Sequence, residues 1–146
     1  MLMQTQGNDD IENDKKTLIA IVKEMSESTT GAQSTKHWAH DALWFDIPPF
    51  ASKGIKPAVK MFDAVFKNFK SCKIAILTTE VIVSTGMGIV CTVQQVDIVF
   101  QNDSSKTLFV RQTDCFKKSG GAWKLVHQHA SVPSGGEWDG KIITGQ

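Results

Sequence analysis

The chain has 146 residues, of which 41% are hydrophobic and 21% charged, with a formal net charge of +1. That length suits one domain, and the composition is typical of an ordinary globular protein. The balanced charge gives no reason to expect a nucleic-acid or membrane partner. No run approaches the roughly 18 apolar residues of a membrane span, and the first ten residues lack the apolar core of a signal peptide.

Three cysteines, Cys72, Cys91 and Cys115, are an odd number, and they lie far apart without Cys-x-x-Cys spacing. This pattern favours free thiols in a reducing compartment, so we expect a cytoplasmic protein. The sequence has neither a glycine-rich phosphate loop nor a Gly-x-Ser-x-Gly elbow. We therefore expect no cofactor, and serine hydrolysis is not supported.

Helical patterns dominate the first part of the chain. After a loose tail, Asp9 and Glu12 resemble a capping box, which predicts a helix from about Asp9 to Ser28. A second, short helix is expected from Ala32 to His40, with Trp38 as its large apolar contact.

A short strand is expected from Asp41 to Asp46, because the prolines that follow it cannot continue a ladder. Pro48 to Gly54 is then a loop. The clearest helix runs from Ile55 to Lys70. Its apolar stripe either belongs to the core or walls an apolar pocket, and consists of Ile55, Ala58, Val59, Phe62, Val65, Phe66 and Phe69.

The remainder consists of β-branched runs separated by turn formers, which predicts three consecutive hairpins in an antiparallel meander. The expected strands are Ser71–Ser84, Ile89–Phe100, Thr107–Lys117 and Ala122–Val132. Residues 134–146 have no periodicity and are expected to be irregular. We predict a single domain over residues 1–146, with its core at about 9–133.

The last strand follows Gly120 and Gly121, whose freedom to adopt positive φ suits a hairpin corner. Alternation places Trp123, Leu125, His127, His129 and Ser131 on one side. The other side carries Lys124, Val126, Gln128, Ala130 and Val132. Because neither side is purely polar, both faces should meet protein or a ligand. The strand is therefore expected in the middle of the sheet.

Helices followed by a long antiparallel sheet predict the α+β class. The helices should cover the concave face of a curved sheet and leave a cone-shaped pocket. The outer face would then expose a broad apolar patch, which is unusual on a monomer. We therefore expect a homodimer packed through that face.

The element order resembles the nuclear transport factor 2-like superfamily, with its cystatin-like fold, which includes ketosteroid isomerases and SnoaL-type polyketide cyclases. Ala39 to Asp46, followed by Gly54 and the phenylalanine-rich helix, is similar to the first-strand motif of the isomerases. Gly121 to Pro133 is similar to the closing motif of SnoaL-like proteins and to the end of the calcium/calmodulin-dependent kinase hub domain. The resemblance covers about residues 9 to 133, and this fold hosts enzymes, carriers and scaffolds alike.

The resemblance implies that Asp46 is a general base that shuttles a proton beside a carbonyl. The isomerases also hold the resulting oxyanion, commonly with a tyrosine and a protonated aspartate. This chain has no tyrosine, so a steroid isomerase of the usual kind is not expected. Protonated Asp114 or the Gln112 amide would have to supply the donor.

An ungapped pairing with the hub domain places its pocket arginines on Gln94, Asp114 and Ala130, so an anion-binding pocket is not expected. The same pairing predicts a pocket lining of Thr92, Gln94, Val96, Val110, Gln112, Asp114, Phe116, Val126, Gln128 and Ala130. It assigns Arg111, Thr113, Trp123, Leu125, His127 and His129 to the outer, dimer-forming face. A register error of one residue would exchange the two sets.

A ligand in such a pocket would be a small apolar molecule with one or two polar groups. The residues expected to bind it are Trp44, Phe50, Phe62, Phe66, Gln94, Gln112 and Gln128.

Each candidate also has a structural interpretation. Asp46 could be a turn-capping residue rather than a base, and Asp114 a paired structural carboxylate. His127 and His129 lie side by side on a strand, but no further ligands at suggestive spacing accompany them, so we expect structural or interface histidines and no metal. Two functions follow. The protein is either an isomerase, cyclase or dehydratase that uses carboxylate proton transfer on an apolar substrate, or a non-catalytic binding or dimerisation module.

Overall fold

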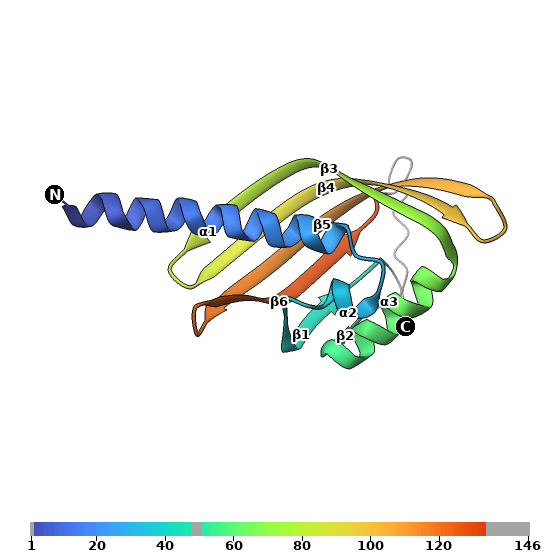
Figure 1. Cartoon of the computed structure of the whole chain (residues 1–146), viewed down its shortest axis with the longest axis horizontal. Coiled ribbons are helices and arrows are strands. Elements are labelled where there is room, and N and C mark those ends of the chain that lie inside the picture. Colours follow the sequence, from blue (N-terminus) through green and yellow to red (C-terminus); the bar gives the residue numbers. More distant parts are fainter. Residues whose placement is uncertain (1, 48–50, 134–146) are drawn as a thin grey trace, which may run out of the picture.

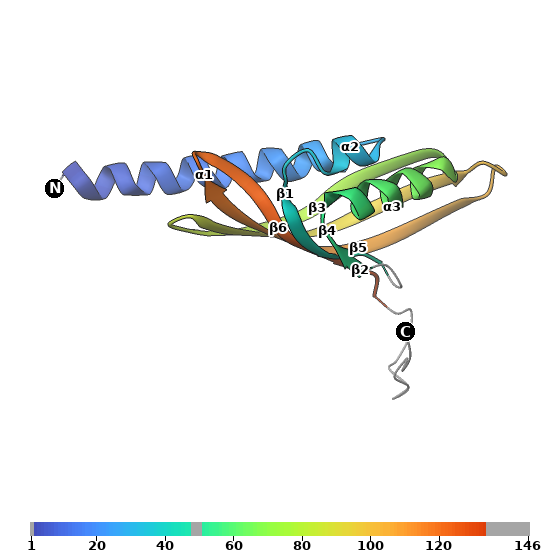
Figure 2. The same cartoon turned by 90° about the horizontal axis from the view of Figure 1, so that it is seen from below.

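The computed structural model describes residues 2–47 and 51–133, with side chains from residue 7 onward. One curved, six-stranded sheet forms a single layer, with strand order β2-β1-β6-β5-β4-β3. The three helices lie on the same, concave side of this sheet (Figure 1, Figure 2). This arrangement confirms the predicted α+β class and cystatin-like fold. None of the described helices is long and apolar enough to cross a bilayer.

The elements in chain order are α1 (Leu2–Ser26), α2 (Gly31–Ser34), β1 (Trp38–Phe45), β2 (Ala51–Lys53), α3 (Ile55–Lys67), β3 (Phe69–Ser84), β4 (Met87–Phe100), β5 (Ser105–Ser119) and β6 (Ala122–Ser131). The four strands of the predicted meander are confirmed, and each pairs antiparallel with the next. Gly120 and Gly121 have φ of 57° and 79°, as a tight hairpin corner requires.

Several boundaries in the first half differ from the sequence prediction, among them the end of α3, which lies at Lys67 rather than at Lys70, so that Phe69 begins β3. Helix α1 begins at Leu2 rather than at Asp9, because the residues before the capping pattern include good helix formers. Helix α2 ends at Ser34, and Trp38 begins β1 instead, where it pairs with Leu125 of β6. Residues 51–53, expected in a loop, form β2 and pair with the end of β1. In the last two cases, pairing with another strand overrides the local pattern.

Strand β6 is central, as predicted: it pairs antiparallel with β5 and parallel with β1. Its alternation is interrupted, because Cys115 pairs with His127 while Phe116 pairs with Leu125, so that Val126 is an extra residue. Such a β-bulge shifts the side-chain pattern by one position. Consequently Leu125 faces inward before the bulge, and Gln128 faces inward after it.

The concave face holds two apolar clusters. The packed end, where α1 crosses the sheet, contains Leu18, Ile21, Val22, Trp38, Ala42, Trp44, Ala58, Met61, Val90, Phe116, Trp123 and Leu125. The hollow end contains Val96, Ile98, Val110 and Ala130. At the packed end the Trp123 indole N–H donates to Asp14 Oδ1 at 3.1 Å, which ties α1 to β6. The packed end is thus the core that positions the hollow end.

Candidate ligand-binding site

A cavity of about 210 Å³ lies between α3 and the hollow end of the sheet. We call it the cone. Its walls are largely apolar and come from α1, α2, α3 and all four strands of the meander. The lining residues are Val22, Met25, Ser26, Ser28, Ser34, Asp46, Ile47, Met61, Phe62, Val65, Phe66, Phe69, Cys72, Ile74, Gln94, Val96, Ile98, Leu108, Val110, Gln112, Gln128 and Ala130. An apolar cavity of 150 Å³ in another protein holds benzene, so the cone has room for a somewhat larger molecule.

Helix α3 supplies the aromatic wall. Its apolar positions recur at helical spacing, which turns Phe62 and Phe66 to the same side, with ring centroids 6.2 Å apart. Phe69 follows at the start of β3 and packs edge-on against Phe66. Phe62 also contacts Trp38 of the packed end, at 5.9 Å between centroids. The stripe therefore serves both purposes proposed for it, since it joins the core and walls the cone.

A polar belt separates the cone from the packed end. Asp114 is fully buried, and its two carboxylate oxygens accept hydrogen bonds from Gln112 Nε2 at 2.9 Å and from Gln128 Nε2 at 2.8 Å. Burial raises the pKa of Asp114 to about 6, although the two amide hydrogen bonds oppose that rise. Gln112 and Gln128 line the cone, whereas Asp114 lies behind them.

Gln94 completes the belt on β4. It is buried, it lines the cone, and its Nε2 donates to Thr92 Oγ1 at 2.9 Å. Each of the three glutamine side chains thus donates one amide N–H to a neighbouring side chain of the sheet. These bonds fix the amides in place at the wall of the cavity, as a preorganised binding site requires.

Asp46 lies directly after β1, whose last residues Trp44 and Phe45 pair with Gln128 and His129 of β6. Its side chain is half-buried and lines the cone, and its Oδ1 accepts a hydrogen bond from the Ile47 backbone N–H at 2.7 Å. Desolvation raises the pKa of this carboxyl group, and the bond from Ile47 partly offsets that rise. Asp46 therefore bonds the backbone, as the interpretation as a turn cap expects, and it also lines the cone, while its role as a general base stays a prediction.

The remaining expected ligand-binding residues are divided. Trp44 lies in the packed end, 3% exposed, and its indole N–H donates to the Gly54 carbonyl at 3.2 Å. It is a core residue and is not among those that line the cone. Phe50 lies outside the described residues. Phe62, Phe66, Gln94, Gln112, Gln128 and Asp46 come together around one cavity.

Sequence reasoning missed several wall residues. Ile98 and Leu108 continue the inward alternation of Gln94 and Val110, so extending the period-2 pattern along both strands would have found them. Val22 and Met25 of α1 also line the cone, but their helical pattern indicates only a buried face and not what that face covers.

Of the predicted lining, Gln94, Val96, Val110, Gln112, Gln128 and Ala130 line the cone, whereas Thr92, Asp114 and Phe116 are buried but are not among the lining residues. The assignment of faces is wrong for three residues of β6. Trp123 and Leu125, expected on the outer face, are buried in the packed end, and Val126, expected in the pocket, lies elsewhere. The physical reason is the bulge at Val126, which reverses the alternation.

His127 and His129 follow the bulge and face outward, around the ring of Phe45, at 5.3 Å and 5.6 Å between centroids. The Nδ1 of His127 bonds the Leu43 carbonyl at 2.9 Å, which gives it a structural role between β6 and β1. Within the part of the chain that the structure describes, no three histidine, cysteine, aspartate or glutamate side chains converge as metal ligands would.

Comparisons with solved structures show the same fold. A nuclear transport factor 2-like superfamily protein from Salmonella enterica serovar Typhimurium has a TM-score of 0.79 at 13% identity, over 90% of this chain and 99% of its own. A protein from Streptomyces avermitilis, described provisionally as a dehydratase of the nuclear transport factor 2-like family, has a TM-score of 0.74 at 13% identity, over 84% and 99%. A provisional aromatic ring hydroxylase from Novosphingobium aromaticivorans has a TM-score of 0.75 at 12% identity, over 82% and 89%.

At such low identities these likenesses concern the fold alone. Among curated proteins the sequence has no significant match. The model of the SnoaL-like domain matches residues 16–135, which include the C-terminal part of α1, all the strands and every described residue that lines the cone. The chain therefore belongs to the family of SnoaL-like domains.

Proposed function

We propose that this SnoaL-like protein binds a small apolar molecule in the cone and transfers a proton at a carbon beside the polar group of that molecule, with Asp46 as general base. The observation that carries the proposal is a half-buried carboxylate in the wall of a largely apolar cavity, with its pKa raised by desolvation. A raised pKa brings a carboxylate closer to the operating pH and favours proton transfer.

The substrate's polar group would lie at the belt of glutamines. When Asp46 removes a proton beside a carbonyl, negative charge develops on the carbonyl oxygen and needs hydrogen-bond donors. Of the two candidate donors, the geometry favours the Gln112 amide, because Gln112 lines the cone and Asp114 lies behind it. Asp114 then acts as a positioning residue that holds the amides of Gln112 and Gln128.

Isomerisation, cyclisation and dehydration of an apolar substrate can all begin with this proton abstraction. The absence of tyrosine from the chain favours the second candidate, a non-catalytic binding module built on the same cone. The two candidates differ in one measurable respect, because only the enzyme exchanges protons with its ligand.

The test is proton exchange at the α-carbon of ketones in D₂O, followed by NMR. We expect the wild type to accelerate deuterium uptake by at least one apolar ketone, and Asp46→Asn to abolish that acceleration while the ketone still binds. Binding without exchange in the wild type would instead support the binding module. Exchange that persists in Asp46→Asn would refute the role of Asp46.

We also propose a homodimer packed through the outer face of the sheet, in the cytoplasm, where the three free thiols of the chain would stay reduced. Phe109 is 50% exposed there, and Leu43 and Phe45 are 41% and 39% exposed. The corrected face excludes Trp123 and Leu125. Sedimentation should give about twice the 16.1 kDa of one chain, and Phe109→Asp should shift the protein toward monomer. A wild-type monomer at high concentration would contradict the proposal.

A further inference from the structure

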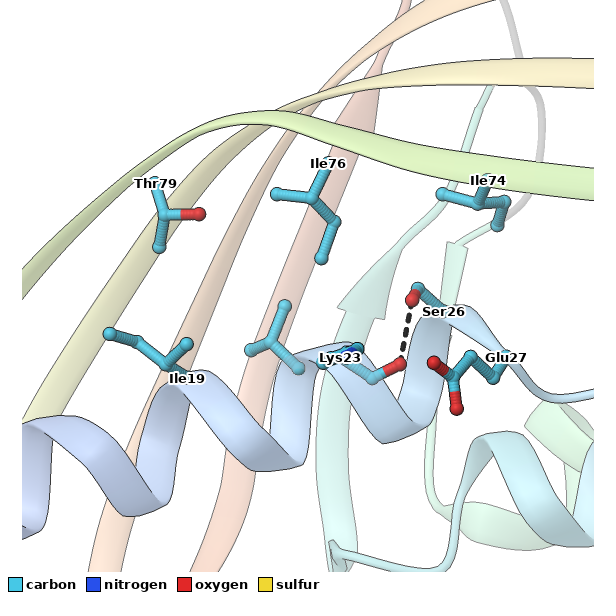
Figure 3. Close-up of a pocket in the computed structure, with 8 residues that line it drawn as sticks. Ile19, Lys23, Ser26, Glu27, Ile74, Ile76 and Thr79 are labelled. Atoms are coloured by element: carbon cyan, nitrogen blue, oxygen red, sulfur yellow. Dashed lines mark hydrogen bonds between the residues drawn. The ribbon is translucent and has the colours of Figure 1, made fainter.

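A second cavity, of about 350 Å³, runs between α1 and the edge strand β3. We call it the side groove. Figure 3 shows α1 on one side and β3 on the other, with their side chains directed toward each other across the gap. The lining residues are Ile19, Val22, Lys23, Ser26 and Glu27 from α1, and Ile74, Ile76 and Thr79 from β3.

The side groove and the cone are adjacent. Val22, Ser26 and Ile74 line both of them, so these three side chains lie between the two spaces. Gln112 and Gln128 of the polar belt lie on β5 and β6, whereas the side groove opens along β3. Two to three strand spacings of about 4.8 Å separate these strands from β3, which gives a path of roughly 10–14 Å from these two glutamines to the groove.

The lining of the side groove is mainly apolar on its inner side. Ile19, Ile74 and Ile76 face the gap, and the Ser26 hydroxyl is already engaged with the Lys23 carbonyl at 2.6 Å. The charged residues of the lining, Lys23 and Glu27, have opposite signs and so select no net charge. These walls suit an uncharged hydrocarbon chain better than a polar group.

From the shared lining of these two adjacent apolar spaces we infer that the ligand is an elongated molecule with a polar head and an alkyl tail. The head lies at Gln112 and Gln128, the apolar body fills the cone, and the tail continues past Ile74 into the side groove between α1 and β3. The inference rests on the proposed function for the position of the head, and it adds the class of substrate: a molecule with a linear aliphatic chain, longer than the cone alone can hold.

The experiment measures the affinity of a homologous series of methyl ketones, with butyl, hexyl, octyl and decyl chains, by isothermal titration calorimetry. Burial of each further methylene contributes about 0.8 kcal/mol, or roughly a fourfold gain in affinity. We expect affinity to keep rising through the longer members of the series. Affinity that stops rising after the shortest ketones, or the absence of binding by every member, would overturn the inference.

A matched pair of variants locates the tail. Ile19→Trp fills the side groove from α1, and it should remove most of the gain of the longer ketones, so that the decyl ketone binds at least tenfold more weakly than to the wild type. Ile82→Trp adds the same side chain on β3 at a position that is 65% exposed and outside the groove lining. It should leave the whole series unchanged. A decyl ketone that binds Ile19→Trp as tightly as the wild type would also overturn the inference.

The same ketones distinguish this inference from the proposed function. If affinity depends on chain length but no α-proton exchanges with D₂O, the function of Asp46 is wrong and the elongated ligand stands. If exchange occurs without any dependence on chain length, the proton transfer stands and the elongated ligand is wrong.

Discussion

The two ends of the concave sheet face are built from the same strands and yet differ in what fills them. On β4 and β5 the packed end has Val90 and Phe116, both fully buried under α1 and the tryptophans. A few residues along the same strands, Val96 and Val110 face the cone, where α3 closes over the sheet without filling the space. Between the two ends lies the polar belt around Asp114.

This difference separates stability from binding within one sheet. A buried carboxylate and buried amides stabilise less than apolar side chains of the same volume would. Here they occupy the boundary, where the packed end holds the strands in place and the glutamines can present polar atoms to the cavity. Substitutions at the packed end should therefore affect folding, and substitutions at the hollow end should affect binding.

The largest effect is expected from Leu125→Asp, which places an unpaired carboxylate in the packed end. Leu125 is fully buried, so this change tests the core and not, as the uncorrected face assignment implied, the dimer. A protein of this size has only about 5–15 kcal/mol of stability, and the cost of the buried charge should prevent folding. Circular dichroism should show an unfolded or insoluble chain. Val126→Asp, at the adjacent bulge, should fold; equal behaviour of the two variants would contradict the assigned faces.

The next largest effect is the dependence of the free energy of unfolding on pH that Asp114 should cause. The pKa of Asp114 is about 6 in the fold against about 3.9 for a free aspartate, so the folded state holds a proton that the unfolded state has lost between these values. The contribution of Asp114 to the free energy of unfolding should therefore fall as the pH rises from about 4 to about 6. The fall should total roughly 3 kcal/mol, because one pKa unit corresponds to about 1.36 kcal/mol.

Asp114→Asn should lack this contribution, so the difference in unfolding free energy between variant and wild type should change by that amount across the same pH range. Asp46, whose pKa is also raised, is present in both proteins and cancels from the difference. Chemical denaturation at several pH values measures it. Parallel curves for the two proteins would show that folding does not raise the pKa of Asp114.

A smaller effect on the free energy of unfolding is expected when alanine is replaced by leucine at each of the two ends. Ala58 is fully buried in the packed end, and Ala58→Leu should cost about 1–3 kcal/mol by overpacking. Ala130 lines the cone, and Ala130→Leu should change the free energy of unfolding by less than about 1 kcal/mol, because the cavity accommodates the larger side chain. It should nevertheless weaken binding of the methyl ketones. Equal destabilisation by the two variants would mean that the cone is not free space.

The smallest effect tests the contact between α2 and α3, which hold one wall of the cone. A Cβ added at Gly31 would lie 2.5 Å from the Val59 carbonyl oxygen, so that backbone must move. Gly31→Ala should lower the free energy of unfolding by about 1 kcal/mol or somewhat more. Gly7→Ala, where a Cβ meets nothing within 4 Å, should leave stability unchanged or raise it slightly, since alanine favours a helix. Thermal melts compare the two, and an equally tolerated Gly31→Ala would show that the contact yields easily.

Local patterns were sufficient for the meander and for most of the cone. Turn formers marked the hairpins, and alternation along β4 and β5 brought Gln94 and Gln112 to the correct face. Alternation failed at Val126, since a bulge depends on how β5 and β6 pair and leaves no mark in either strand alone. The strand at Trp38 was missed for a similar reason, because its partner in β6 is remote in sequence.

The parallel pairing of β1 with β6 has a consequence for the kinetics of folding. His127 bonds the backbone of Leu43 across a separation of 84 residues, and the Leu125 N–H bonds the His37 carbonyl nearby. Contacts between residues so far apart in the sequence form slowly, because the intervening chain must lose conformational entropy before the contact can stabilise the fold. The hairpins of the meander should thus form first, and β1 should add last. During synthesis the ribosome releases β1 long before its partner, so the edge of β1 that pairs with β6 stays unpaired until β6 has been synthesised.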